Sequence, residues 1–187
     1  QPPPQTDAAL KAAYDKYKTL KEGANADYIP ALAKVDSKIY GIALVTTDGK
    51  VYTAGDIKSA VSIQSISKVF TMAKVMEEQG PDAIENRIGV DATGMRFNSI
   101  VSVGFAQKAL GGPEINPLVN PGAITATSMV QGKTRDEVWN KILAFHSDFA
   151  GRPFIVQNPG GDDAPSPSSP NKSMWLYGQY DEASRGK

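Results

Sequence analysis

Apolar and polar residues follow two different periods along this chain, and the change of period predicts a mixed α+β fold. Apolar residues three or four apart predict a helix over Asp7–Leu20. β-Prone runs over Tyr40–Thr46 and Val51–Thr53, joined by Asp48-Gly49, predict an antiparallel hairpin with a tight turn. The helical period then returns. The expected apolar face of the first helix is formed by Leu10, Tyr14 and Tyr17.

Three further helices are predicted after the hairpin. The first runs from Ser62 to Glu78, and the second runs over Ala123–Met129 behind a turn at Asn120-Pro121-Gly122. The third opens at Thr134-Arg135-Asp136-Glu137, whose spacing is that of a capping box. The apolar residues assigned to the Ser62–Glu78 helix are Val69, Phe70, Ala73 and Met76. Those of the last helix are Val138, Ile142 and Leu143.

Composition divides the chain into three parts. Residues 1–6 form a proline-rich arm, residues 7–153 are expected to form one domain, and residues 154–187 are rich in Pro, Gly and Ser. Within this last part, Pro159–Pro170 is too polar to bury a core and is expected to be a loop or a disordered tail. The Gln1–Gln5 start is what signal-peptide cleavage would leave, so export is the expected location over the cytoplasm. A trimmed boundary would leave the same start.

Charge and cysteine content exclude several classes of function. The chain has 20 basic and 20 acidic residues, so its zero net charge favours neither nucleic acid nor an anionic membrane surface. No apolar run approaches the ~20 residues that a membrane-spanning helix needs. Cysteine is absent, which excludes thiol catalysis, disulfides and cysteine-based zinc sites. No metal-ligand spacing is present, and no cofactor is expected.

The strongest chemical signal is Ser65-Ile66-Ser67-Lys68. A serine hydroxyl needs a neighbouring base to act as a nucleophile, and residues three apart on a helix share a face. A lysine that burial drives toward its neutral form can be that base, and a helix start offers N–H groups and a positive dipole end to an oxyanion. Ser169 and Lys172 have the same spacing but lie in the Pro/Ser-rich part. The predicted hairpin and helix around Ser65 therefore favour Ser65 and Lys68.

Two other motifs are weaker. His146, the only histidine, is followed by Asp148, but residues two apart do not face each other on a helix, so a Ser-His-Asp triad is not favoured. A polar role near the helix end is expected for His146. Gly132-Lys133-Thr134 resembles the end of a phosphate loop, but the glycine that this motif requires five residues earlier is missing.

Six stretches of the chain resemble the serine-dependent glutaminases, in the order of that family and over about the first 153 residues. They are Asp27–Ala33, Tyr40–Thr46, Ser62–Phe70, Phe97–Ile100, Asn116–Ile124 and Phe149–Pro153. The resemblance implies an α+β fold similar to β-lactamases and D,D-transpeptidases, with helices packed on an antiparallel sheet. It further implies hydrolysis of glutamine to glutamate and ammonia, and a homo-oligomer, either a dimer or a tetramer.

The same resemblance implies a role for each matching residue. Ser65 would be the nucleophile and Lys68 its general base, while Tyr28, Gln64, Ser65 and Asn120 would contact the substrate. An amide such as that of Asn120 can donate to a carboxylate and accept from an ammonium group. Structural roles remain open: a core aromatic for Tyr28, a helix-start polar residue for Gln64 and a turn former for Asn120.

The chain departs from the family pattern after Pro153. The substrate-binding Glu and Asn, the tyrosines and the glycine-rich strand of the family's second half are not found in 154–187, so that half is expected to be incomplete. Two alternatives therefore remain open. One is an inactive, truncated remnant. The other is a β-lactamase or D,D-peptidase, although the Ser-Asp-Asn and Lys-Thr-Gly elements of those enzymes are absent from the sequence.

Overall fold

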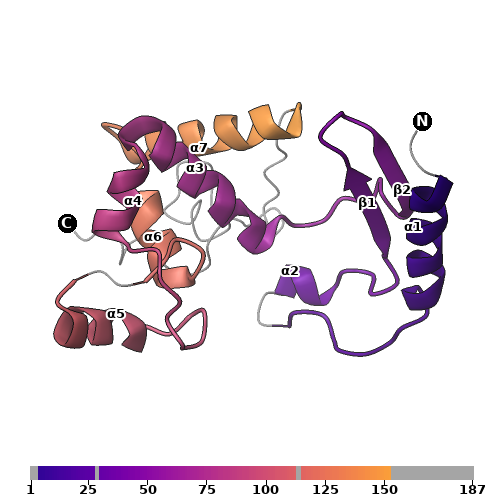
Figure 1. The fold of residues 1–187 in the computed structure, drawn as a ribbon, viewed down its shortest axis with the longest axis horizontal. Coiled ribbons are helices and arrows are strands. Elements are labelled where there is room, and N and C mark those ends of the chain that lie inside the picture. The colour runs from indigo at the N-terminus through magenta and orange to yellow at the C-terminus, as the bar shows by residue number, and fades with distance from the viewer. Residues whose placement is uncertain (1–3, 28–29, 113–114, 153–187) are drawn as a thin grey trace. The chain divides into compact units, whose positions relative to one another are not determined.

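The structure is a computed structural model that describes residues 4–27, 30–112 and 115–152. The chain divides into two compact units, Gln1–Ser62 and Ile63–Lys187 (Figure 1). Both carry helices, and the described sheet belongs to the first unit, so the α+β fold class is confirmed. Tyr28 and the predicted tail at 154–187 lie outside the described residues.

The first unit contains the predicted helix and hairpin. Its elements are α1 (Pro4–Tyr17), α2 (Pro30–Ala33), β1 (Gly41–Val45) and β2 (Val51–Gly55). The strands pair antiparallel with Gly41 opposite Gly55 and Val45 opposite Val51. Gly49 has a φ of 81°, a conformation that glycine adopts without steric penalty, so the Asp48-Gly49 turn is confirmed.

Helix α1 packs against both strands of the hairpin, as Figure 1 shows. Leu10 of α1 and Tyr52 of β2 are buried, and the ring of Tyr14 stacks on that of Tyr40 with the centroids 5.3 Å apart. Tyr17, expected on the same apolar face, is exposed because the helix ends at this residue. The helix is therefore confirmed, with an end that falls three residues before the predicted one.

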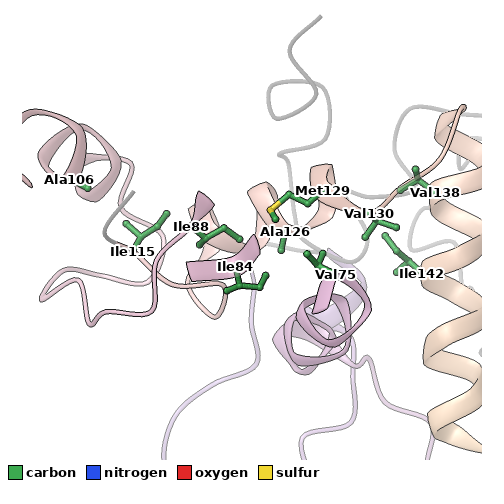
Figure 2. Packing of buried hydrophobic residues seen from close by; sticks show 10 residues of the cluster. All are labelled: Val75, Ile84, Ile88, Ala106, Ile115, Ala126, Met129, Val130, Val138 and Ile142. Atoms are coloured by element: carbon green, nitrogen blue, oxygen red, sulfur yellow. The ribbon is translucent and has the colours of Figure 1, made fainter. Parts of the chain in front are cut away.

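All the regular secondary structure in the described part of the second unit is helical. Its elements are η1 (Gln64–Ile66), α3 (Ser67–Gln79), α4 (Pro81–Arg87), α5 (Val101–Phe105), the π-helical turn η2 (Ala106–Leu110), α6 (Asn120–Met129) and α7 (Arg135–Ala150). Helix α3 packs against α4, α6 and α7. Figure 2 shows the apolar core between these elements, formed by Val75, Ile84, Ile88, Ala106, Ile115, Ala126, Met129, Val130, Val138 and Ile142.

Helix α3 buries a different face from the predicted one. Val69 and Met76 are 46% and 38% exposed, whereas the buried residues are Ser67, Lys68, Thr71 and Val75. A buried polar group is tolerated when it has hydrogen-bond partners. The Ser67 hydroxyl donates to the Gln64 carbonyl and the Lys68 ammonium donates to Asn120 of α6. Of the expected apolar face, Phe70 and Ala73 are partly buried, so the prediction was wrong for Val69 and Met76.

The two later helices begin in different ways. Asn120-Pro121-Gly122, predicted as a turn, is the first turn of α6, where proline fits because no N–H is needed from it. The capping box of α7 is confirmed. The Thr134 hydroxyl accepts from the Glu137 N–H at 3.1 Å, and the Glu137 carboxylate accepts from the Lys133 N–H at 2.8 Å.

Candidate active site

Ser65 lies in the short helical turn η1, which leads directly into α3. It is exposed. The preceding residue, Gln64, has a φ of 48°, and among the described residues it is the one non-glycine with a positive φ. The Ser67 hydroxyl donates to the Gln64 carbonyl at 2.7 Å. A sparsely populated backbone conformation persists when its surroundings hold it, and this hydrogen bond is one contact that restrains Gln64.

Lys68 lies one helical turn after Ser65 and faces it. Its Nζ is 3.0 Å from the Ser65 Oγ and 2.5 Å from the Asn120 Oδ1. The residue is 4% exposed. Burial lowers the pKa of its ammonium group, because the charged form loses hydration. The predicted pairing of Ser65 and Lys68 on one face is confirmed.

Asn120 reaches this pair from the start of α6. Its own N–H donates to the Phe97 carbonyl at 2.7 Å. The preceding loop is held by Asn116, whose amide donates to the Asp91 carbonyl at 2.7 Å and accepts from the Leu118 N–H at 3.0 Å. Gly122 lies so close to the Asn116 carbonyl that a Cβ would overlap it. Asn120 is therefore positioned by backbone contacts on both sides.

The structure thus brings together three of the predicted site residues, Ser65, Lys68 and Asn120, all within the second unit. Gln64 is next to Ser65 in the chain, and Tyr28 lies outside the described residues. The substrate-binding roles of Tyr28, Gln64 and Asn120, like the catalytic roles of Ser65 and Lys68, stay predictions.

Sequence reasoning missed one residue near this site and assigned another to the wrong environment. Phe97 places its ring centroid 5.6 Å from the Lys68 Nζ, a distance typical of a cation–π contact. Its presence in one of the resembling stretches was the available signal. His146 is not a polar residue at a helix end: it is 3% exposed, its Nδ1 is 2.8 Å from the Ile142 carbonyl oxygen, and its ring packs against Phe70. Burial lowers its pKa.

The part of the chain that the structure describes contains neither a metal-binding cluster nor a membrane-spanning helix. There, no three acidic or histidine side chains converge as metal ligands would. Within the same ranges, no helix has both the length and the apolar character needed to cross a bilayer.

The family description "Glutaminase" matches residues 23–164 of this chain. A glutaminase of Colwellia psychrerythraea is 46% identical over 153 residues, which cover 82% of this chain and 48% of that protein. A glutaminase of Brucella canis is 42% identical over 173 residues, covering 90% of this chain and 53% of that protein. The chain therefore spans about half the length of the curated relatives it matches.

Solved structures give the same result. The chain superposes on the probable glutaminase ybaS with a TM-score of 0.69 at 40% identity, covering 75% of this chain and 44% of that one. It superposes on Mglu in its tris and glutamate form with a TM-score of 0.72 at 29% identity, covering 81% of this chain and 33% of that one.

Proposed function

Since this chain belongs to the glutaminase family, we propose that it hydrolyses glutamine to glutamate and ammonia through Ser65 and Lys68. One observation carries the proposal: the Lys68 amine lies between the Ser65 hydroxyl and the Asn120 amide oxygen, at 3.0 and 2.5 Å. A serine activated by a lysine requires a buried amine beside its hydroxyl and a fixed acceptor that holds this amine.

In the first step, neutral Lys68 accepts the Ser65 proton while the Ser65 Oγ attacks the side-chain amide carbon of glutamine. One N–H of the amine stays on the Asn120 oxygen, which leaves the lone pair free to face Ser65. A tetrahedral oxyanion forms, and the positive end of the helical stretch that begins at η1 favours it. The oxyanion collapses, the C–N bond breaks, and the leaving nitrogen takes the proton from Lys68 as ammonia departs.

In the second step, water hydrolyses the glutamyl ester on Ser65. Lys68, neutral again, accepts a proton from the water as it attacks the ester carbon, and returns a proton to the Ser65 oxygen as the C–O bond breaks. Glutamate leaves and the starting state is restored. The lowered pKa of Lys68 supports this role, because a larger share of the lysine is then neutral near neutral pH than for an exposed amine.

Substrate recognition is proposed on the same residues. With its oxygen on Lys68, the Asn120 amide can offer its N–H groups to the carboxylate of glutamine. Gln64 and Tyr28 are proposed as further contacts, on the resemblance described above. The solved Mglu structures include a glutamate form, which supports a product-binding site in this fold. A homo-oligomeric assembly is likewise proposed from the family alone.

The test is ammonia release from glutamine by the purified chain, compared with Ser65→Ala and Lys68→Arg. We expect Ser65→Ala to abolish turnover, since the covalent step is lost. Lys68→Arg should lower kcat by about 10²–10⁴-fold, because a guanidinium keeps its proton. Mass spectrometry of the quenched reaction should show one added glutamyl group on wild type and none on Ser65→Ala. Turnover that survives in Ser65→Ala would remove the covalent mechanism.

A parallel measurement of penicillin hydrolysis distinguishes the proposed glutaminase from the other Ser-x-x-Lys enzymes. If penicillin is hydrolysed and glutamine is not, the chain is a β-lactamase-type enzyme. If neither is hydrolysed by a folded chain, the inactive-remnant alternative holds.

A further inference from the structure

Phe97 has an unusual position for a large apolar side chain. It is 60% exposed, yet one face of its ring is directed at a buried ammonium group, with the centroid 5.6 Å from the Lys68 Nζ. Cations prefer the face of an aromatic ring because of the ring's quadrupole. The exposed ring thus lies against the buried amine that the proposed mechanism uses as its base.

The backbone around Phe97 fixes this position from two directions. The Phe97 carbonyl accepts from the Asn120 N–H at 2.7 Å. Earlier in the same segment, the Asp91 N–H donates to the Ile115 carbonyl at 3.1 Å, and the Asp91 carbonyl accepts from the Asn116 amide at 2.7 Å. The segment that carries the ring is thus joined to the loop that carries Asn120.

We propose that Phe97 is a positioning residue: its ring covers the solvent side of the Lys68 amine and keeps that amine between Ser65 and Asn120. The effect on catalysis rests on the proposed function, but the effect on Lys68 itself does not. The hydrogen bond to Asn120 is made by the backbone carbonyl of residue 97, so any side chain at this position keeps it. Replacement of the ring therefore tests only the effect of covering the amine.

The ring has two opposed effects on the ammonium group. It excludes water, which disfavours the charged form, and its quadrupole favours that form. Burial lowers the pKa of Lys68, and the Phe97 ring is one of the groups that lie against its amine, so we expect exclusion of water to outweigh the quadrupole. Water in place of the ring should therefore raise the pKa of Lys68 toward its ordinary value.

The experiment is an NMR titration of protein labelled with ¹³C at the lysine Cε, with the Lys68 signal assigned by its loss in Lys68→Met. Wild type is compared with Phe97→Ala and Phe97→Tyr. Phe105→Ala is the control, because Phe105 is an exposed phenylalanine of α5 in the same unit. We expect the pKa of Lys68 to rise in Phe97→Ala and to stay at the wild-type value in Phe97→Tyr and Phe105→Ala. Thermal unfolding shows which variants are folded, and Phe97→Leu replaces Phe97→Ala if the latter is not.

An unchanged pKa of Lys68 in the folded ring-deficient variant, or an equal rise in Phe105→Ala, would overturn the proposal. The titration needs no turnover, so it can succeed even if glutamine is not hydrolysed. Where glutamine is hydrolysed, Phe97→Ala should lower kcat/KM at neutral pH on the order of tenfold and move the acidic limb of its pH profile upward. A lower kcat/KM with an unmoved limb would indicate a merely structural role for Phe97.

Discussion

The side-chain oxygen of Asn120 lies 2.5 Å from the Lys68 ammonium nitrogen, although 52 positions separate the two residues in the chain. Packing of α3 against α6 brings them together. The contact uses one N–H of the lysine in either protonation state, so it orients the rest of the amine toward Ser65. The Asn120 oxygen thus holds the Lys68 amine, and the proposed mechanism leaves the Asn120 N–H groups for the substrate.

The charge at position 120 should control the protonation of Lys68. In Asn120→Asp a carboxylate replaces the neutral oxygen, and an opposite charge at this distance raises the pKa of a lysine. The acidic limb of the kcat/KM pH profile should move to higher pH, with a loss at neutral pH on the order of a hundredfold. Asn140→Asp, an exposed change on α7, adds the same charge elsewhere and should leave the limb in place. An unmoved limb in Asn120→Asp would show that Lys68 is not the titrating base.

Gly122 should tolerate no side chain. A Cβ at this position would overlap the Asn116 carbonyl, so Gly122→Ala must displace the loop that leads to Asn120. We expect a loss of about 1–3 kcal/mol in the free energy of unfolding, measured by urea denaturation, together with a larger loss of activity. Gly104→Ala is the matched control, because Gly104 is also helical and a Cβ there has open space. It should be neutral or stabilising by up to about 1 kcal/mol. Equal stability of the two variants would contradict the close approach.

Glu78 should stabilise the second unit above acidic pH. Its carboxylate accepts from the Gln131 N–H at 2.7 Å and from the Lys141 ammonium at 3.0 Å. Burial alone would raise the pKa of Glu78, but these donors and Lys74 lower it overall. The stabilisation is therefore present above the ordinary value of 4.5 and is lost as the pH falls through the lower folded-state pKa. Glu78→Gln should lose about 1–3 kcal/mol at pH 7.

The control for this prediction is the neighbouring Glu77, an exposed residue that pairs with Lys74. Glu77→Gln should change the free energy of unfolding by less than about 1 kcal/mol, as for other surface ion pairs. The pH dependence of urea unfolding between pH 7 and about 3 checks both variants. Indistinguishable curves for Glu78→Gln and wild type would show that the cluster adds nothing to stability.

His146 should make the folded state sensitive to mild acid. Burial holds its pKa below the ordinary value of 6.5, so the neutral form is the one that fits. Stability should be complete above pH 6.5 and should fall as the pH drops through the folded-state pKa. His146→Phe leaves the chain without a histidine and keeps an aromatic ring beside Phe70. The urea midpoint of His146→Phe should stay constant from pH 8 to about 5.5, whereas the midpoint of wild type should fall over this range. Parallel slopes in the two proteins would disprove this assignment.

Features set by neighbours in the sequence could be predicted. Asp48-Gly49 sets its hairpin because the turn needs a residue that adopts positive φ, and Thr134 with Glu137 sets the start of α7 through contacts within one turn. Ser65 and Lys68 meet for the same reason, since three residues on a helix span less than one turn. In each case the deciding interaction spans only a few residues.

Features that depend on packing could not be predicted in this way. Val69 and Met76 recur with the same helical period as the residues that α3 buries, so the period does not show which face is buried. Only the hydrogen-bond partners of Lys68 and Ser67 determine which face of α3 is buried. The positive φ of Gln64 has no residue-type signal, because glutamine has no preference for it. The contact between Phe97 and Lys68 likewise exists only once the loop before α6 is in place.

The contact between Lys68 and Asn120 also has a consequence for biosynthesis. A ribosome makes Ser65 and Lys68 well before Asn120, at a few to some tens of residues per second. When only η1 and α3 have emerged from the ribosome, the nascent chain already carries Ser65 and Lys68. At this stage the lysine is still in water and keeps its proton. Only after α6 emerges and packs on α3 can the amine lose its hydration and gain its acceptor. Under the proposed mechanism, reactivity at Ser65 would thus arise only after α6 has packed on α3.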